Sequence, residues 1–288
     1  MGDRHRVSAV VVNYNARDHL LECVRSLRSD GVEEIIVVDN ASTDGSLAAI
    51  TALDPDVVCV PTGGNLGFGS AANRGLAVAS GVYVAVLNPD VVVESGTMKA
   101  LAAALDADPT LAAVAPRVDN PDGTLYPSVR AFPSMTDAIG HAFLGFIAPR
   151  NRFSTRYRLL DWDHSRAVEV DWASGTCLML RSASEEGRFD ESYFMYVEDV
   201  DLCWRLRQAG WRVGYEPAGR VIHTVGASSE LAPYRMILAH HRSLLHFSAR
   251  TARGRHRLLL PFVAGGLELR TVLAWVQRAY RGRPHASL

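Results

Sequence analysis

The sequence predicts an α/β protein with a Rossmann-like, mainly parallel central sheet and helices on both faces. Two observations carry this prediction. Over the first hundred or so residues, short runs of β-branched and apolar residues alternate with amphipathic helical stretches, which is typical of parallel strands joined by helical crossovers. Polar residues directly follow three of the apolar runs, as expected where a ligand binds beyond the carboxyl ends of parallel strands.

The elements of this half follow from their local patterns. Buried strands are expected where β-branched residues are concentrated, at 7–12, 35–38, 57–60 and 83–87. Amphipathic helices are expected between them, at about 19–27, 46–53, 70–79 and 97–105. In the first helix, Leu20, Val24 and Leu27 share one face. This alternation predicts a doubly wound nucleotide-binding half.

The second half of the chain is less regular. The pattern loosens from Leu111 to about Asp171, where we expect an insertion with a hairpin turn at 120–123, formed by Asn-Pro-Asp-Gly. Regular structure returns with a strand at 173–181 and a helix at 199–209 that ends at Gly210. After about Ser229 two helices are expected, separated by an arginine-rich joint at Arg250, Arg253, Arg255 and Arg257.

The composition sets limits on function. A chain of 288 residues with 48% hydrophobic residues can bury a sizeable core. Its 30 basic and 31 acidic residues give a net charge of −1, which offers no electrostatic case for a nucleic-acid partner. Four cysteines stand among apolar residues without a CxxC pair, which favours a reduced, cytosolic compartment. We expect neither a secretory signal nor a membrane span, because residues 1–7 are polar and the longest apolar stretch, 258–267, is short and contains Pro261.

Polar residues follow the first, second and fourth predicted strands, and they form three groups: Asn13, Tyr14 and Asn15; Asp39 and Asn40; Asn88 and Asp90. Asn and Asp favour turns and helix caps in general, so any one group has an ordinary structural explanation. Three groups at one edge of a sheet favour a ligand site. Asp39 is the candidate to bind a nucleobase or ribose, whereas we expect Asp44 to cap the following helix.

The segment at 63–69 is rich in glycine, which lets a backbone approach a ligand closely. It matches neither GxGxxG nor a Walker sequence, so neither a hydride cofactor nor ATP is indicated. Asp90 is the candidate metal ligand, since a hard divalent cation on a diphosphate requires carboxylate oxygen. Glu94 is better explained as a negative charge near the start of the next helix.

Three carboxylates, Glu198, Asp199 and Asp201, stand at a predicted helix start after an aromatic run. For Asp201, stabilisation of the helix N-terminus and a functional role carry equal weight. For Glu198 and Asp199 we favour function, because adjacent acids behind an apolar wall raise each other's pKa, as a general base requires; the helix dipole acts in the opposite direction. His223 follows an apolar pair, and on these residues alone a structural role outweighs a ligand role.

Several ordered motifs resemble those of family 2 glycosyltransferases with the GT-A fold: VVNYN (11–15), VDNASTDGS (38–46), NLGF (65–68), NRG (73–75) and LNPD (87–90). Downstream, FMYVEDVDLCWR (194–205) and GW (210–211) resemble the acidic-pair motif of the rhamnosyltransferase-like branch of that family. The resemblance spans about residues 7–228. Because the motifs occur in order, they are more specific than a single glycine pattern.

The resemblance implies a role for each site residue. Asp90 would bind Mg²⁺ or Mn²⁺ in the place of the family's DxD motif, with His223 as a second ligand, although Asn88 stands where the family often has an acid. Asp199 would be the general base, with Glu198 beside it. The implied donor-binding residues are Asn13, Tyr14, Asn15, Asp39, Asn40, Gly67, Asn73, Arg74, Asn88 and Asp90, and the implied acceptor-binding residues are Trp172, Gly175 and Thr176.

The implied activity is an inverting transfer, in which the base takes a proton from an acceptor hydroxyl that attacks the anomeric carbon of a nucleotide sugar. The branch implies L-rhamnose from dTDP-L-rhamnose as the donor sugar and a polyprenyl-diphosphate-linked GlcNAc as the acceptor, in cell-wall or surface-polysaccharide assembly. The alternatives are another sugar and glycan within the family, or a non-catalytic nucleotide-sugar-binding module. Such a module is expected to lack the acidic pair.

The predicted organisation is a GT-A domain over residues 1–228 and a helical extension over 229–288. The nucleotide-sugar half would end at about 115, and the acceptor half would cover 116–228. Apolar residues beside arginines in the extension could bind anionic lipid, so we expect a cytoplasmic enzyme in peripheral contact with the inner face of the plasma membrane. A packed cap or a homodimer contact explains these helices equally well.

Overall fold

The computed structural model describes residues 7–132, 162–182, 184–224 and 233–281. The predicted parallel strands of the first half are confirmed: β1 (Val7–Asn13), β2 (Glu34–Asp39), β3 (Val58–Pro61) and β4 (Tyr83–Leu87) are parallel and lie in the order β3-β2-β1-β4. The helices α1 (Arg17–Ser29), α2 (Ser46–Leu53), α3 (Phe68–Val78) and α4 (Thr97–Ala107) begin and end within two residues of the predicted bounds.

The sheet continues with strands of both directions, in the order β10-β6-β11-β5. These are β10 (Cys177–Arg181), β6 (Leu111–Asp119), β11 (Arg212–His223) and β5 (Val91–Val93), with β8 (Val168–Val170) beside β11. β10 is antiparallel to both β4 and β6, whereas β6 and β11 are parallel. The 3₁₀ turn η1 (Glu185–Gly187), α7 (Glu198–Gln208) and a small second sheet of β7 (Val129–Arg130) and β9 (Trp172–Ala173) complete this half.

Two sequence predictions in this half were wrong. The loosened pattern after Leu111 contains the nine-residue strand β6, which is buried almost throughout and is rich in alanine with a proline at 116, so neither alternation nor β-propensity indicated it. The single strand expected at 173–181 is divided between β9 and β10, which belong to different sheets. The turn at 120–123 is confirmed, with Gly123 at a φ of +79°. Residues 133–161 of the predicted insertion lie outside the described residues.

Strand β11 pairs with β6 on both sides of an irregularity. Glu216 pairs with Pro116, and the next pair joins Arg220 to Arg117, so that residues 217–219 have no partner in β6. Beyond this bulge, β11 also pairs antiparallel with β5, with His223 opposite Val91. The bulge therefore decides which residue of β11 arrives beside Asp90.

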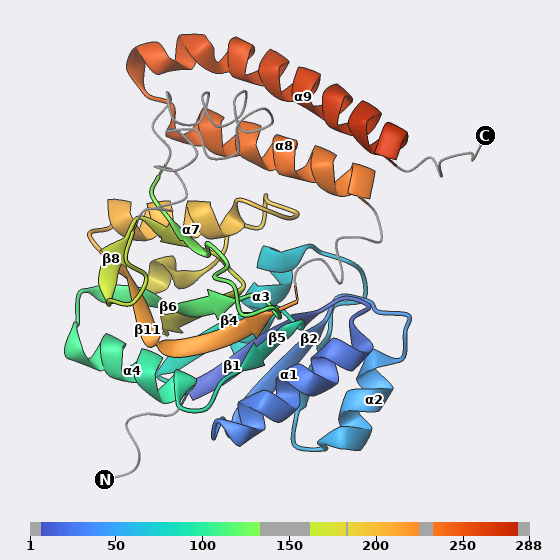
Figure 1. Ribbon diagram of the computed structural model, residues 1–288, viewed down its shortest axis with the longest axis vertical. Coiled ribbons are helices and arrows are strands. Elements are labelled where there is room, and N and C mark those ends of the chain that lie inside the picture. Colours follow the sequence, from blue (N-terminus) through green and yellow to red (C-terminus); the bar gives the residue numbers. More distant parts are fainter. Residues whose placement is uncertain (1–6, 133–161, 183, 225–232, 282–288) are drawn as a thin grey trace.

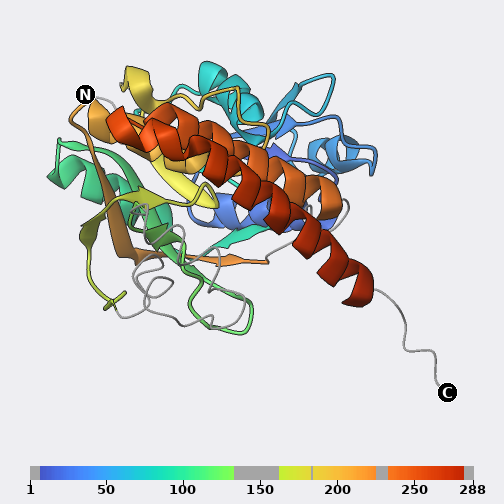
Figure 2. The same cartoon turned by 90° about the horizontal axis from the view of Figure 1, so that it is seen from above.

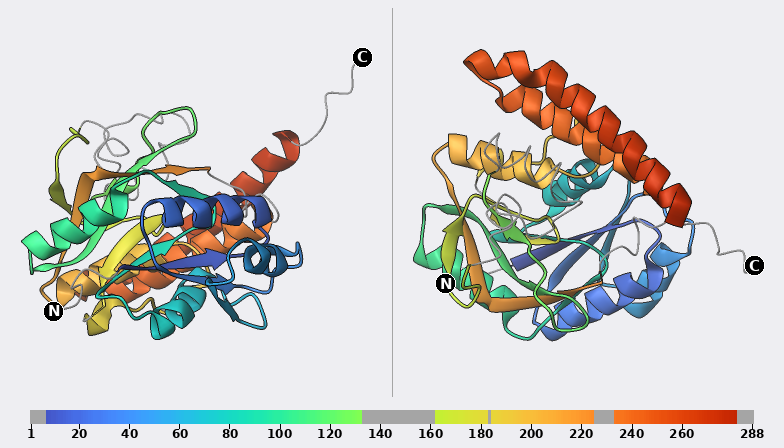
Figure 3. Two further views of the ribbon diagram at one scale, coloured as in Figure 1. Left: turned by 90° about the horizontal axis from the view of Figure 1, so that it is seen from below. Right: turned by 45° about the horizontal axis from the view of Figure 1, so that its top comes forward.

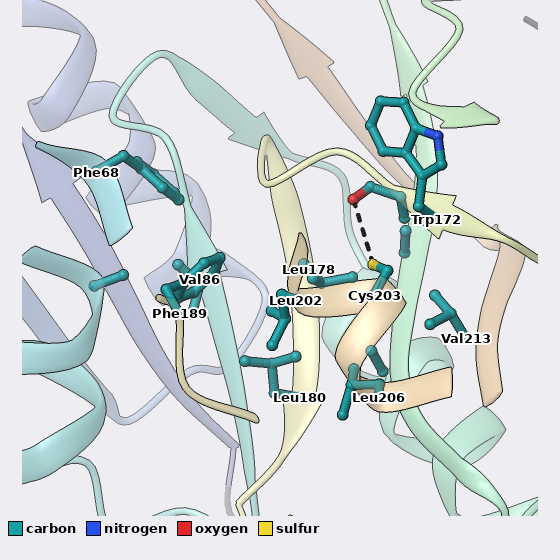
Figure 4. Packing of buried hydrophobic residues seen from close by; sticks show 14 of the residues in the cluster. Phe68, Val86, Trp172, Leu178, Leu180, Phe189, Leu202, Cys203, Leu206 and Val213 are labelled. Carbon is teal, nitrogen blue, oxygen red and sulfur yellow. Dashed lines mark hydrogen bonds between the residues drawn. The ribbon is translucent and has the colours of Figure 1, made fainter. Parts of the chain in front are cut away.

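Helices cover both faces of the sheet, and two cores result (Figure 1). α1, α2 and α4 enclose one cluster of buried residues, and the first two strand positions that alternate into it are Ala9 and Val11. The left panel of Figure 3 shows α1 and α4 across that face. α3 and α7 enclose the other cluster, which includes Val10, Val12 and the residues labelled in Figure 4. The alternation along β1 is the period of two expected for a strand buried on both faces.

The C-terminal extension forms two long helices, α8 (Pro233–Thr251) and α9 (Leu260–Arg281), joined by the 3₁₀ segment η2 (Gly254–Leu259). Figures 1 and 2 show α8 next to the domain that contains the sheet and α7, and α9 on the outer side of α8. The predicted boundary at 228 lies outside the described residues. None of the helices in the described ranges is both long and apolar enough to cross a bilayer.

Specific contacts fasten α8 to the segment before α7. The Ser243 hydroxyl donates a hydrogen bond of 2.9 Å to the Met195 carbonyl, and Arg250 forms an ion pair with Asp190. Phe247 packs edge-on against Trp204, with ring centroids 6.4 Å apart. α8 is thus a packed cap on the domain.

Candidate active site

A cleft of about 600 Å³ lies at the carboxyl ends of β1, β2 and β4. The start of α7, the loop before it and the inner side of α8 complete its wall. Of the predicted site residues, twelve line this cleft: Tyr14, Asn15, Asn40, Gly67, Asn88, Asp90, Trp172, Gly175, Thr176, Glu198, Asp199 and His223. The sheet therefore brings together residues that are more than 200 positions apart in the sequence.

Asn13 and Asp39 lie behind the cleft wall. The parallel register of β1 and β2 pairs Asn13 with Asp39, and the Asn13 side-chain amide donates a 2.8 Å hydrogen bond to the Asp39 carboxylate. The other carboxylate oxygen of Asp39 accepts from the Ser42 backbone N–H at 3.0 Å. Both residues are buried, so in this structure they hold the loop after β2 rather than face the cleft. Asp44 accepts from the N–H groups of Ser46 and Arg17. Its role is therefore structural, but the residue at the N-cap of α2 is Gly45 rather than Asp44.

Asn40 organises the glycine-rich loop. Its amide donates to the Gly67 carbonyl at 3.0 Å, and its oxygen accepts from the Leu66 N–H at 3.0 Å. Gly67 has a φ of +85°, and a Cβ on this residue would lie 1.9 Å from the Phe194 carbonyl oxygen. The adjacent Phe68 N–H donates to that same oxygen at 3.1 Å. Glycine is thus required here for close contact between the donor-side loop and the segment that leads to the acidic pair.

Two predicted donor residues do not reach the cleft. Asn73 is buried against the Phe189 backbone, where its amide group donates to the Phe189 carbonyl and accepts from the Phe189 N–H, each at 2.9 Å. Arg74 is exposed on α3. The NRG motif therefore fastens α3 to the segment at 188–191 in this structure.

Asp90 and His223 face each other across the junction of β5 and β11. Their Oδ1 and Nε2 atoms are 3.2 Å apart, and each side chain is 7% exposed. Asp90 Oδ1 and His223 Nδ1 have no hydrogen-bond partner in the described ranges. Adjacent ligands of an octahedral Mg²⁺ are about 3.0 Å apart, so the pair fits a divalent cation. Because no cluster of three such ligands occurs among the described residues, diphosphate and water would supply the remaining positions.

The acidic pair begins α7 at the cleft. Glu198 is 6% exposed, and its Oε2 atom has no hydrogen-bond partner among the described residues. Burial, reinforced by the charge of Asp199, raises the pKa of Glu198 well above its ordinary value. Burial also raises the pKa of Asp199, while N–H groups of Gly175 and Val200, at 3.0 and 2.8 Å, and the charge of Arg130 act against it. Desolvation therefore outweighs the helix terminus, which answers the question that the residues alone left open.

The backbone before the acidic pair is strained. Tyr196 and Val197 have φ values of +66° and +69°, and a left-handed conformation is unfavourable for a β-branched residue such as Val197. Strain of this kind costs about 1–3 kcal/mol per residue and is concentrated at functional sites. It aims Glu198 and Asp199 into the cleft at the first turn of α7.

The acceptor-side residues surround Asp199. Gly175 donates its N–H to Asp199, and Thr176 accepts at its carbonyl from the Asn88 N–H at 3.1 Å, which ties this loop to the end of β4. Trp172 is buried, and the Arg130 guanidinium lies 5.1 Å above its ring. The interruption between β9 and β10 is thus the segment that donates a backbone N–H group to Asp199.

Sequence reasoning missed several cleft residues. Asn65, Tyr126, Arg130 and Ser174 come from loops or from the short strand β7, and Met236, His240, Leu244 and Phe247 form one stripe of α8. His240 of this stripe is a titratable residue that the sequence patterns did not single out. The residues of this stripe have the spacing of one helix face. A helix that merely packs on the domain has the same spacing, so no sequence pattern indicated that the stripe lines a cleft.

The comparisons with known proteins agree with this geometry. The model of the family "Glycosyl transferase family 2" matches residues 8–186, and the chain belongs to this family. The chain is 38% identical over 280 residues to the N-acetylglucosaminyl-diphospho-decaprenol L-rhamnosyltransferase of Mycobacterium tuberculosis, with 92% of this chain and 91% of that protein covered. It is 28% identical to the rhamnosyltransferase WbbL of Escherichia coli, over 75% of this chain and 83% of that protein.

Solved structures confirm the GT-A fold. The mannosyltransferase PcManGT from Pyrobaculum calidifontis, in complex with GDP-Man and Mn²⁺, has a TM-score of 0.56 at 18% identity, over 99% of this chain and 77% of that one. GalNAc-T7 with UDP, GalNAc and Mn²⁺ has a TM-score of 0.58 at 17% identity, over 76% of this chain and 44% of that one. At these identities the likeness concerns the fold.

Proposed function

We propose that this glycosyltransferase moves L-rhamnose from dTDP-L-rhamnose, with inversion, onto a polyprenyl-diphosphate-linked GlcNAc in cell-wall or surface-polysaccharide assembly. The observation that carries the proposal is the pairing, in one cleft, of a fixed carboxylate at Asp199 with the Asp90–His223 pair. The 38% identical relative, whose name specifies an L-rhamnosyltransferase acting on N-acetylglucosaminyl-diphospho-decaprenol, supports the choice of substrates.

The residues divide the work as follows. Asp199, held by two backbone N–H groups, takes the proton of the acceptor hydroxyl, which attacks the anomeric carbon as the nucleoside diphosphate departs from the opposite face. Asp90 and His223 would hold Mg²⁺ or Mn²⁺, which when bound stabilises negative charge on the diphosphate. Tyr14, Asn15 and Asn40 line the donor end of the cleft.

The experiment is a transfer assay with UDP-, GDP- and dTDP-sugars and a GlcNAc-diphospho-polyprenol acceptor, with and without EDTA. We expect transfer from dTDP-L-rhamnose, loss of transfer with EDTA, and a loss on the order of 10³-fold or more for Asp199→Asn, because both proton removal and orientation of the acceptor fail. Efficient transfer from another donor alone would overturn the choice of sugar. An Asp199→Asn variant as active as the wild type would overturn the catalytic assignment.

We also propose that α9 rests on the inner face of the plasma membrane. Its outer side exposes large apolar side chains, of which Phe262 is 77% exposed, together with Leu258, Leu269, Val272 and Leu273. Residues 233–288 contain ten arginines and a single acidic residue, Glu268, although the whole chain has a net charge of −1. An apolar helix face within a strongly basic segment suits an anionic bilayer. A second copy of the chain, forming a homodimer through the same face, is the competing occupant.

A further inference from the structure

The proposed acceptor presents a problem of charge. It bears a diphosphate of its own, so that the cleft must hold two diphosphates, one from each substrate. The Asp90–His223 pair lies at the proposed donor end, with Asp90 between β4 and β5 and His223 at the end of β11. Buried phosphates need positive or hydrogen-bonding partners, because an uncompensated charge in a desolvated cleft is strongly unfavourable.

Few basic side chains line the described part of the cleft. Among the described residues that line the cleft, the basic ones are Arg130, His223 and His240. Arg130 comes from β7 and lies over the Trp172 ring, at the predicted acceptor side. His240 comes from the inner stripe of α8 and meets the Tyr196 ring edge-on, with centroids 5.3 Å apart.

The charge of Arg130 acts on both Asp199 and His240. It counteracts, without overcoming, the effect of burial that raises the pKa of Asp199. Burial, with smaller contributions from the charges of His241, Arg270 and Arg130, lowers the pKa of His240 to about 4. The imidazole is therefore neutral at physiological pH and lies in positive surroundings that would attract an anion. His240 lines the cleft from α8, so its ring can contact a ligand there.

The geometry of the substrate agrees with this location. A hydroxyl of GlcNAc must lie at Asp199, while the diphosphate is attached to the anomeric carbon of the same ring, so the second diphosphate lies about one sugar ring away from Asp199. The apolar side chains of Met236, Leu244 and Phe247 continue the stripe of α8 on either side of His240 and suit the start of a lipid chain.

Resting on the proposed function, we propose that Arg130 and His240 form the subsite for the diphosphate of the lipid-linked acceptor. Arg130 supplies positive charge close to the acceptor side, with its Nε donating to the Pro127 carbonyl at 3.2 Å; a guanidinium is a group that phosphate oxygens favour. His240 supplies a neutral donor from the opposite wall. The extension is then part of the acceptor site and completes the cleft from above.

The test uses two short acceptors that differ only in the diphosphate: GlcNAc-diphospho-citronellol and citronellyl GlcNAc. We expect Arg130→Gln and His240→Gln each to raise the KM of the full-length enzyme for the diphosphate acceptor on the order of 10- to 100-fold, the weight of a charge-assisted hydrogen bond. KM for the neutral acceptor and for the donor should not change. Arg130→Lys should restore part of the loss, and Arg25→Gln, on the exposed side of α1, is the matched control.

The outcomes separate the two proposals. An equal effect of the substitutions on both acceptors, or a wild type that does not distinguish them, would overturn the diphosphate subsite while leaving the transferase intact. Absence of transfer to either acceptor from every donor would overturn the proposed function and the subsite with it. Thermal unfolding of each variant, with donor binding measured by calorimetry, shows whether a loss of activity reflects misfolding. If Arg130→Gln does not fold, the KM values of His240→Gln and Arg130→Lys test the diphosphate subsite instead.

Discussion

Glu198 and Asp199 are neighbours in the sequence with different surroundings. Both oxygens of Asp199 accept backbone N–H groups, so this carboxylate is fixed in position, and these contacts counteract part of the rise that burial causes in its pKa. Glu198 is buried with one oxygen unpaired, and it faces the charge of Asp199. The two acids therefore differ in their cost to the fold when ionised.

The Glu198 environment predicts how stability depends on pH. A carboxyl group whose pKa is raised by folding contributes stability that is fully present below its unfolded pKa of about 4.3 and is lost as the pH rises through the folded-state value. We expect the melting temperature of the wild type to fall between about pH 5 and pH 9, and that of Glu198→Gln to fall less, as measured by calorimetry. Glu33→Gln, at an exposed site, should keep the wild-type slope. Parallel slopes for the wild type and Glu198→Gln would contradict this account.

Gly67 gives a second prediction at the scale of one residue. Gly67→Ala combines a positive φ with a Cβ that would meet the Phe194 carbonyl, whereas Gly63→Ala has a comparable φ of +76° and nothing within 4 Å. We expect Gly63→Ala to cost about 1–2 kcal/mol in the free energy of unfolding from backbone strain. Gly67→Ala should cost more and also weaken binding of the nucleotide sugar. Denaturant unfolding and calorimetric titration measure the two effects, and equal results for both variants would show that the contact with Phe194 is unimportant.

Among the elements, α7 contributes both to the wall of the cleft and to attachment of the cap. Its first turn presents Glu198 and Asp199 to the cleft. Two residues on, Asp201 is completely buried and pairs with Arg205 at 2.7 Å and with Arg250 of α8 at 3.4 Å. Of the two explanations that the sequence left equal for Asp201, the structure favours the structural one.

Asp201→Asn should therefore damage the fold rather than the chemistry. Loss of a charge-assisted hydrogen bond costs about 1.5–3 kcal/mol, and the partly exposed arginines limit the loss because water can reach them. We expect a lower melting temperature and easier proteolysis between α7 and α8, with kcat within a few-fold of the wild type when measured well below that temperature. A variant of normal stability whose kcat has collapsed would move Asp201 into the catalytic machinery.

The elements also show what a sequence can predict. β1 to β4 and their helices could be predicted from the sequence, because buried strands and amphipathic helices of ordinary length alternate there. β6 did not, since alanine and proline weaken its β-propensity although burial on both faces stabilises it. Asp90, Asp199 and His223 could be proposed from motifs, whereas Arg130 and His240 could not, because only tertiary packing brings β7 and α8 to one cleft.

At the scale of the whole molecule, the chain is built in layers of different charge. The near-neutral total conceals a strongly basic extension, so residues 1–232 carry the balancing negative charge. α8 closes the cleft, and α9 lies outside α8 with its apolar side exposed (Figure 1). The molecule is therefore polarised, with one end suited to a lipid surface.

Vesicle sedimentation tests this polarity. We expect binding to phosphatidylglycerol vesicles that weakens with salt, little binding to phosphatidylcholine, and at least about tenfold weaker binding for the double variant Phe262→Glu and Leu269→Glu, because each basic residue near an anionic surface adds about 1 kcal/mol and the apolar face adds further affinity. Val78→Glu, at an exposed valine of α3, is the matched control. A stable dimer that the double variant dissociates, without vesicle binding, would assign the face to a second copy instead.

The bulge in β11 has a consequence for how this enzyme tolerates insertions and deletions. Residues 217–219 lie partly at the surface, where a change in length is usually harmless. Here a shift of one residue would turn the end of the strand over, since successive side chains point to opposite faces, and His223 would leave Asp90. Deleting Ala218 should thus abolish Mn²⁺ binding, measured by calorimetry, while Ala218→Ser preserves it. The length of residues 217–219 therefore determines whether His223 lies beside Asp90 at the proposed metal site.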